Sequence, residues 1–205
     1  MRDAVLHDFS QLSEVEINLT YDARLSRPSI GKSKEVGRQD DVWALWDSCI
    51  QEADAVLFIA PETGGILTQL TLMAERLNKQ VLGCCSSAVQ IATDKYQTYL
   101  QLPRYEILTI LTYLLGDFPK SERGSWVAKP IDGAGCGGMA LFDEVTQLQA
   151  WMKGRESTHI IQPLQHGEAA SFSMLCKDGR AHLLTCNRQK IVMDNGAIQY
   201  QGGVI

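Results

Sequence analysis

The chain has 205 residues, of which 45% are hydrophobic and 21% charged, a balance that is typical of a soluble globular protein with one or two domains and excludes a disordered one. Its 19 Lys and Arg residues against 24 Asp and Glu residues give a net charge of −5, so no basic field favours nucleic acid or an anionic membrane, and small molecules are the expected partners. No apolar run approaches the roughly 20 residues of a membrane span and the N-terminus lacks a signal-peptide core, so we expect a cytoplasmic protein.

Strand and helix patterns alternate along the first part of the chain. In chain order, the predicted elements are a helix over 1–12, a strand over 15–21, a helix over 40–53, a buried strand over 55–61, a helix over 66–77 and a strand over 80–85. This alternation predicts a Rossmann-like α/β domain over residues 1–92, with a parallel sheet and helices on both faces. The first pattern is helical and no strand precedes it, so we expect the first strand of this architecture to be missing.

The second part of the chain changes character. Thr93 and Asp94 are suitable N-caps for a helix over 94–102, and the polar loop 117–125 marks a boundary. From His159 onward the chain has strand patterns separated by the turns KDGR and DNGA. We therefore predict an α+β domain with antiparallel sheets over 93–205, divided into a glycine-loop part over 93–158 and a hinge with strands over 159–205. The strands expected around the glycine loop cover 126–130 and 139–142, and a helix over 143–152 follows them.

The stretch VAKPIDGAGCGG contains Gly133, Gly135 and Gly138 at the GxGxxG spacing of a dinucleotide-binding loop. A Rossmann fingerprint needs a helix directly after the glycines, whereas here a strand pattern follows, and Glu156, the only acidic residue at a suitable distance, lies in a polar turn. A glycine loop between two strands instead suits a flap whose backbone N–H groups fold over phosphates. Lys129, just before the loop, is then a candidate phosphate partner.

Five motifs in chain order resemble the ATP-grasp ligases: IAPETGGIL, DKYQTY, VAKP with its following glycine loop, IIQPLQHGEAAS, and NRQKI. Within that family the resemblance is to the carboligase group that includes the tyramine–glutamate ligase of methanofuran biosynthesis, and it runs through nearly the whole chain. It implies a Rossmann-like domain followed by an ATP-grasp domain, ATP and Mg²⁺ as cofactors, and small carboxylate and amine substrates, glutamate among them.

The resemblance also implies roles for individual residues. Lys95 and Lys129 correspond to two family lysines that neutralise phosphate charge during catalysis, and Glu168 corresponds to an acidic residue that meets the ribose. The implied ATP contacts are Lys95, Lys129, Gly133, Ala134, Gly135, Cys136, Gly137, Gly138, Gln162, Pro163, Leu164 and Glu168. The expected substrate contacts are Glu62, Asn187, Arg188 and Gln189. Glu62 follows the carboxyl end of a strand, and Asn187 and Gln189 share one face of another strand.

Each of these residues also has a plain structural interpretation. Lys129 can be an exposed strand-end lysine, Lys95 a solvated helix residue, and Glu62 and Glu168 can cap turns. Cys136 is more typical of a small loop residue than of a nucleophile, because no histidine lies near it in sequence. The six cysteines contain no CxxC and the four histidines form no ligand pattern, so we expect reduced cysteines in the core and assign no metal ligand.

Two departures from the family pattern bear on function. Pro163 follows Gln162 where the family usually has a glutamate, and a proline cannot donate a backbone hydrogen bond to adenine. Family members also continue past the NRQ strands into a segment whose Glu and Asn hold Mg²⁺, and this chain ends at Ile205 before it, so we expect a fragment or a degenerate copy.

The leading hypothesis is an ATP-dependent carboxylate–amine ligase that acts through an acyl phosphate. One alternative is a non-catalytic ATP-binding protein or subunit, and another, based on GxGxxG alone, is a nicotinamide oxidoreductase. The sequence leaves open the acid, the amine and the oligomeric state, a homo-oligomer included.

Overall fold

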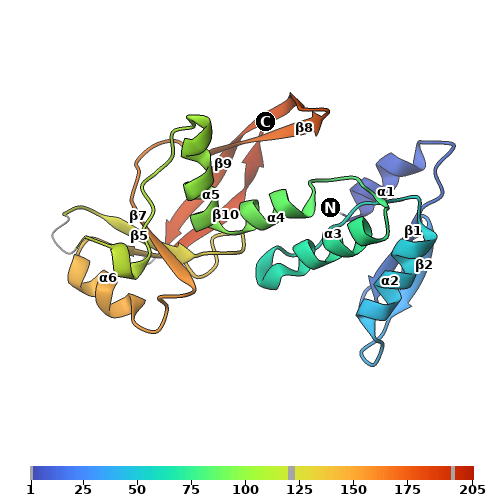
Figure 1. Cartoon of the computed structure of the whole chain (residues 1–205), viewed down its shortest axis with the longest axis horizontal. Coiled ribbons are helices and arrows are strands. Elements are labelled where there is room, and N and C mark those ends of the chain that lie inside the picture. The colour runs from blue at the N-terminus through green and yellow to red at the C-terminus, as the bar shows by residue number, and fades with distance from the viewer. Residues whose placement is uncertain (1, 120–122, 195–196) are drawn as a thin grey trace. The chain divides into compact units, whose positions relative to one another are not determined.

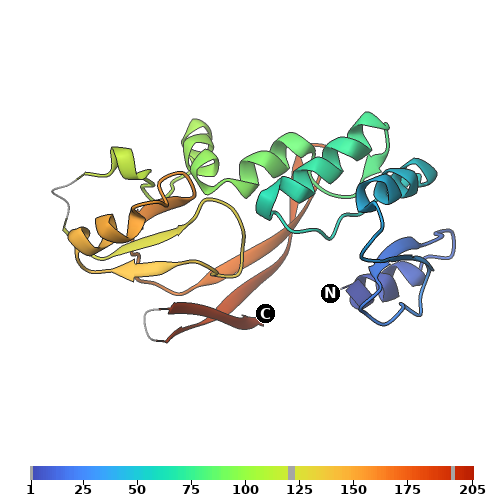
Figure 2. The same cartoon turned by 90° about the horizontal axis from the view of Figure 1, so that it is seen from below.

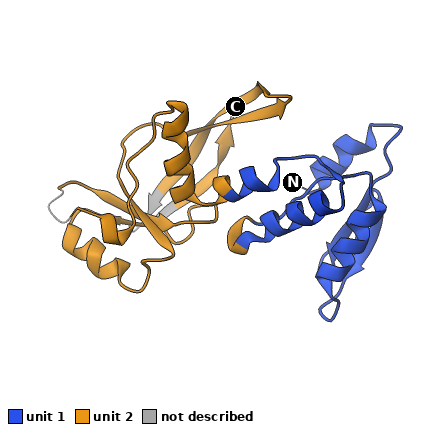
Figure 3. Ribbon diagram, in the orientation of Figure 1, with its two compact units in different colours: residues 1–61, 65–90 blue, residues 62–64, 91–205 orange. Residues whose placement is uncertain are grey.

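The computed structural model describes residues 2–119, 123–194 and 197–205, which form two compact units (Figure 1 and Figure 2). Unit 1 comprises Met1–Pro61 and Gly65–Gln90, and unit 2 comprises Glu62–Gly64 and Ile91–Ile205 (Figure 3). The short segment Glu62–Gly64 therefore has unit 1 on both sides in sequence but belongs to unit 2 by its contacts.

Unit 1 alternates helices and strands. Its elements are α1 (Arg2–Ser10), β1 (Asn18–Asp22), β2 (Lys32–Val36), α2 (Val42–Glu52), β3 (Ala55–Val56), α3 (Ile66–Arg76), β4 (Gln80–Val81) and the start of α4 (Ser86–Thr93). The pairs β1–β2 and β3–β4 are both parallel. The α/β class predicted for this part of the chain is confirmed, although the four strands form two separate two-stranded sheets.

The strand predicted as buried over 55–61 is much shorter and more exposed than expected. Only Ala55 and Val56 pair with β4, and the side chains of Leu57 and Ile59 are 44% and 48% exposed. A strand is buried on both faces only when elements cover both sides of a wider sheet. A two-stranded sheet with two paired residues per strand provides little surface for such layers. The predicted strand is therefore confirmed only for Ala55 and Val56, and the predicted burial is wrong for the whole segment 55–61.

Unit 2 opens with helix α5 (Lys95–Gln101), whose N-cap is Asp94 as predicted. The Asp94 carboxylate accepts hydrogen bonds from the backbone N–H groups of Tyr96 and Gln97 at 2.8 and 2.9 Å. Two short 3₁₀ helices follow, over Leu102–Tyr105 and Leu115–Asp117. The first sheet of unit 2 then forms from β5 (Trp126–Pro130), β6 (Ala140–Phe142) and β7 (His159–Pro163), with β5 in the centre and both pairings antiparallel.

Helix α6 (Val145–Met152) lies against this sheet and completes the main core of the unit (Figure 2). Leu148 and Met152 of α6 are fully buried and pack with side chains of the sheet. The buried core residues are Phe118, Trp126, Ala128, Leu148, Met152 and Ile161. Trp126 and Ala128 are two residues apart in β5, so the α6 side of the central strand is the side of its even-numbered residues.

The second sheet of unit 2 has the order β10–β9–β8, all antiparallel, and consists of β8 (Ala170–Lys177), β9 (Arg180–Asp194) and β10 (Ala197–Val204). The predicted KDGR turn joins β8 to β9 through Asp178 and Gly179, whose φ angles of 52° and 70° are those of a two-residue type I′ hairpin. The two strands predicted over 181–193 are one strand of 15 residues. The predicted Asn195–Gly196 turn lies outside the described residues.

The cysteines are reduced, but they do not lie in the core as predicted. Cys49 and Cys136 are half-buried, and the exposed cysteines are Cys84, Cys85, Cys176 and Cys186. Two of the exposed residues follow the short strand β4, and two lie in the β8–β9 hairpin. None of the helices in the described ranges has the length and apolar character needed to cross a bilayer.

Candidate functional site

The loop of residues 131–139, called the glycine loop below, connects β5 to β6 as the sequence predicts. Four of its residues have a positive φ: 81° at Gly133, 77° at Gly135, 63° at Cys136 and 71° at Gly138. Repeated left-handed residues turn successive backbone N–H groups toward a common side, an arrangement that binds anions. Because the loop leads into strand β6 and not into a helix, its geometry differs from that of a dinucleotide-binding Rossmann loop.

Space around the glycines divides the loop into an anchored and an open part. A Cβ placed on Gly133 would lie 3.1 Å from Thr63 Oγ1, and one on Gly138 would lie 3.0 Å from Pro130 Cγ. A Cβ on Gly135 or Gly137 would meet no atom within 4 Å. The two ends of the loop are therefore packed, whereas its middle has room for a ligand.

Lys95 lies at the first residue of α5 and binds the base of the glycine loop. Its backbone N–H donates to the carbonyl oxygen of Ile131 at 3.0 Å. Its ammonium nitrogen donates to the carbonyl oxygens of Ile131, Asp132 and Gly133 at 3.3, 3.1 and 2.9 Å. The helix and the loop are therefore held together by one residue.

Lys129 lies in β5, one residue before its end, and its side chain is half-buried. Because Trp126 and Ala128 face the α6 core, Lys129 projects from the opposite face of the sheet. Its ammonium makes no hydrogen bond or ion pair with any residue in the described ranges. The alternative of an ordinary exposed strand-end lysine therefore does not describe its environment.

The two lysines influence each other electrostatically. Burial lowers the pKa of the Lys129 ammonium, and the neighbouring positive charge of Lys95 lowers that pKa further. Burial also lowers the pKa of Lys95, while the carboxylates of Asp132, Glu62 and Asp94 partly offset this effect. In both lysines the cost of burying the charged form outweighs the negative charge nearby. A bound anion would therefore stabilise the protonated forms of Lys95 and Lys129, called the lysine pair below.

The predicted hinge residues Gln162, Pro163 and Leu164 lie at the end of strand β7 and directly after it. The Gln162 side-chain amide donates to the hydroxyl of Thr112 at 2.7 Å, and Thr112 is only 3% exposed. The backbone N–H and C=O groups of Ile161 both hydrogen-bond to Tyr113, so they point away from strand β5. The backbone nitrogen of Pro163, two residues further along β7, points to the same side. The missing N–H of Pro163 therefore removes no hydrogen bond to β5.

Glu168 and Arg188, which the sequence assigns to ribose and to substrate, lie together. The Arg188 guanidinium donates from Nε to the Glu168 carboxylate, and both side chains are mostly exposed. Asn187 donates instead to the Thr185 hydroxyl at 3.2 Å, two residues along the same face of β9. By strand alternation Asn187 and Gln189 share one face and Arg188 occupies the other. The structure gives none of the three a hydrogen bond or ion pair with the lysine pair among the residues that it describes.

The segment Glu62–Gly64, called the Glu62 turn below, contacts the base of the glycine loop. The Gly64 backbone N–H donates to the Asp132 carboxylate at 3.2 Å, across 68 residues of sequence. Glu62 lies close enough to Lys95 for its charge to raise the pKa of that lysine. Sequence analysis gave no role to Asp132, although it directly precedes the first glycine of the loop.

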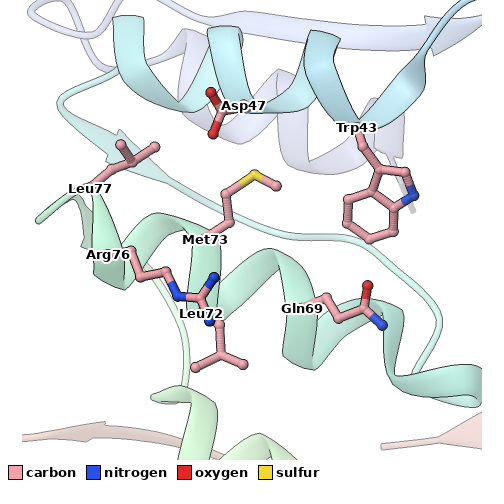
Figure 4. Close-up of a pocket in the computed structure, with 7 residues that line it drawn as sticks. All are labelled: Trp43, Asp47, Gln69, Leu72, Met73, Arg76 and Leu77. Carbon is pink, nitrogen blue, oxygen red and sulfur yellow. The ribbon is translucent and has the colours of Figure 1, made fainter.

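A separate pocket lies between α2 and α3 in unit 1 (Figure 4). It has a volume of about 410 Å³, and its walls include the indole of Trp43 and the side chain of Met73. None of the residues that line it is a predicted site residue. It therefore adds nothing to the site at the glycine loop.

The residues present do not form a metal site. Within residues 2–119, 123–194 and 197–205, no three His, Cys, Asp or Glu side chains lie together in an arrangement that could hold a metal ion. Magnesium takes hard oxygen ligands, above all carboxylates. Among the described residues we therefore assign no Mg²⁺ ligand.

Comparison with known proteins gives two domain matches. A family model described as an ATP-grasp domain matches residues 92–205, and one described as a pre ATP-grasp 3 domain matches residues 15–89. The tyramine–L-glutamate ligase of Methanocaldococcus fervens is 32% identical over 184 residues, which cover 90% of this chain. The matched region is 49% of that relative, so the chain spans about half its length.

Two solved structures have a similar fold. The L-amino acid ligase from Bacillus licheniformis aligns over 90% of this chain and 47% of its own, with a TM-score of 0.68 and 15% identity. The N5-carboxyaminoimidazole synthetase from Staphylococcus aureus, in complex with ADP, aligns over 96% of this chain and 53% of its own, with a TM-score of 0.67 and 13% identity. At these identities the similarity concerns the fold alone.

Proposed function

This chain belongs to the ATP-grasp family, and from that premise we propose that it binds ATP at the glycine loop and serves in joining a carboxylate to an amine. The observation that carries the proposal is the lysine pair. Two half-buried ammonium groups lie close enough to depress the pKa of Lys129, beside a loop with four left-handed residues and an open middle. Triphosphate would supply the negative charge that this arrangement lacks.

Each part of the proposed ATP site has its own task. The N–H groups of the glycine loop and the ammonium of Lys129 would bind the β- and γ-phosphates, and Lys95 would hold the loop while adding its own charge. The hinge residues Gln162, Pro163 and Leu164 would contact adenine, and Glu168 would meet the ribose. Stabilising the charge that develops on the γ-phosphate oxygens is the main catalytic effect such a site can provide.

The reaction that suits this site has two displacements. In the first, an oxygen of the substrate carboxylate attacks the γ-phosphorus, the bond from that phosphorus to the β–γ bridging oxygen breaks, and ADP leaves. In the second, the amine nitrogen attacks the carbonyl carbon of the acyl phosphate, inorganic phosphate leaves and the ammonium protons pass to solvent. Bound Mg²⁺ would supply further neutralisation of phosphate charge, and Lys95 and Lys129 are the described residues that would neutralise this charge from the protein. Glutamate and tyramine are the first substrates to test, because a relative named for them covers 90% of this chain.

ADP release by the purified chain tests this function directly. The chain is mixed with ATP, Mg²⁺, glutamate and a panel of amines that includes tyramine, and the same assay is run on Lys129→Ala. Amine-dependent ADP release that disappears in Lys129→Ala supports a ligase. ATP binding without ADP release for any pair of substrates supports the second candidate, a nucleotide-binding protein without turnover. A chain that binds no ATP contradicts both.

A further inference from the structure

The Glu62 turn is tied to the glycine loop by contacts that the proposed function does not use. The Asp132 carboxylate accepts the hydrogen bond of the Gly64 N–H at 3.2 Å, and the backbone carbonyl of the same Asp132 accepts one from the Lys95 ammonium at 3.1 Å. One residue of the loop therefore contacts both the turn and the first lysine. The Glu62 turn belongs to unit 2, although the residues on both sides of it in sequence belong to unit 1 (Figure 3).

Sterics support the same close approach. Gly133 follows Asp132, has a φ of 81°, and approaches the turn closely, because a Cβ there would lie 3.1 Å from the Thr63 hydroxyl oxygen, tighter than most such contacts. The turn and the loop base are thus in contact at two successive loop residues. A displacement of Asp132 or Gly133 must move the turn or break these contacts.

Charge connects the same groups. The carboxylates of Asp132 and Glu62 both act on Lys95, so the turn places one negative group and the loop another beside the first ammonium. The Glu62 side chain is exposed and makes no hydrogen bond or ion pair with any part of the chain that the structure describes. It is therefore free to meet a ligand at the position where the turn holds it.

We propose that Asp132 is a positioning residue that ties the Glu62 turn to the base of the glycine loop, so that nucleotide binding at the loop is transmitted to the turn and Glu62 is presented beside the phosphates. The proposal rests on the proposed function for the nucleotide, but the contact between Asp132 and Gly64 is independent of it. Lys95 would couple the nucleotide to the turn. A phosphate that draws the Lys95 ammonium away from the loop carbonyls would change the position of Asp132, which the turn contacts.

Amide hydrogen exchange followed by NMR tests this proposal at single residues. Four proteins are compared with and without ATP: wild type, Asp132→Ala, Asp132→Asn and Asp143→Ala. Asp132→Asn keeps a side-chain oxygen that can accept from Gly64. Asp143→Ala is the matched control, because the Asp143 carboxylate also accepts a hydrogen bond in the same unit, from the Ser125 hydroxyl at 2.6 Å, but does not touch the turn. Circular dichroism and thermal unfolding verify that each variant is folded.

Without ATP, the Gly64 amide should exchange roughly 2- to 10-fold faster in Asp132→Ala than in the other three proteins, since one hydrogen bond is lost. With ATP, amides of residues 133–138 should gain protection in all four, and Gly64 should gain protection in all but Asp132→Ala. Equal Gly64 exchange in Asp132→Ala and wild type would overturn the proposal, as would the same loss in Asp143→Ala. If ATP protects no loop amide in the wild type, the proposed function and the transmission both fail, while faster Gly64 exchange in Asp132→Ala alone would still support the positioning role.

Discussion

The Lys95 ammonium nitrogen lies 2.9 Å from the carbonyl oxygen of Gly133, so the first residue of helix α5 is bonded to the first glycine of the loop. The two other carbonyls that it contacts belong to Ile131 and Asp132. An ammonium has three donors, and all of them are directed at neutral acceptors here. A phosphate oxygen is a stronger, charged acceptor, so the ammonium can exchange one of these bonds for a phosphate contact without being left unpaired.

Replacing Lys129 should weaken ATP binding far more than adenosine binding. A charge-assisted contact to phosphate contributes about 1.5 to 3 kcal/mol, so Lys129→Ala is expected to lower ATP affinity roughly 10- to 100-fold. Adenosine lacks phosphates, and its affinity should stay within about twofold of wild type. Calorimetric titration of both proteins with both ligands gives the comparison. An equal loss for the two ligands would show that Lys129 acts on the fold.

The affinity for ATP should fall with rising pH earlier than for a site built from ordinary lysines. The pKa of Lys129 and that of Lys95 both lie below the usual 10.5, so their charge is lost as the pH rises through these lowered values. Phosphate favours the protonated lysines and raises their pKa on binding, so ATP binding in this range should take up protons. Titrations at one alkaline pH in two buffers of different ionisation enthalpy measure that uptake. It should shrink in Lys129→Ala, and an unchanged value would rule out this lysine as its source.

The two ends of the glycine loop should tolerate alanine differently from its middle. Gly138 has a φ of 71° and a Cβ there would lie 3.0 Å from Pro130 Cγ, so Gly138→Ala should lower the free energy of unfolding by about 1 to 2 kcal/mol. Gly137 is the matched control, because its φ is not positive and a Cβ would meet nothing within 4 Å. Gly137→Ala should cause no measurable loss. Urea unfolding of both variants provides the numbers, and equal losses would contradict the described loop geometry.

A substitution at the predicted adenine-binding hinge should lower the affinities for ATP and adenosine alike, unlike Lys129→Ala, which should lower mainly the affinity for ATP. Thr112→Val keeps the shape of the buried side chain but removes the hydroxyl that accepts the Gln162 amide at 2.7 Å. With the hinge amide left unpaired, ATP and adenosine should both lose affinity, by a similar factor of roughly 3 to 10. Thr185→Val, which removes a similar acceptor from Asn187 in β9, should leave both affinities unchanged. A loss confined to ATP would place the hinge away from adenine.

Local patterns in the sequence predicted much of this architecture because their causes are local. Asp94 caps α5 through the N–H groups of Tyr96 and Gln97, and Asp178 and Gly179 form their hairpin from their own φ preferences. The interpretation of the glycine loop as a strand–loop–strand feature also depended on neighbours in sequence. Strand β2 was missed because the segment KSKEV is polar and lacks the apolar signal that strand prediction uses.

The remaining features depend on residues far apart in sequence. Lys95 meets carbonyls 36 to 38 residues away, and Gly64 meets Asp132 across 68 residues, so no periodicity or spacing could reveal either contact. The pairing of Glu168 with Arg188 arises from the β8–β9 register, which places Ala170 opposite Arg188. The prediction that Leu57 is buried was wrong for a similar reason, since the exposure of a side chain depends on which elements cover its strand and not on the sequence of the strand.

Calorimetric titration of the wild-type chain with ATP, and separately with NAD, tests whether the glycine loop is an ATP site. The lysine pair lies beside a glycine loop that leads into strand β6, a geometry that suits a triphosphate and lacks the helix N-terminus on which a dinucleotide pyrophosphate rests. We expect saturable binding of ATP and no measurable binding of NAD. Binding of NAD in the absence of ATP binding would contradict this expectation.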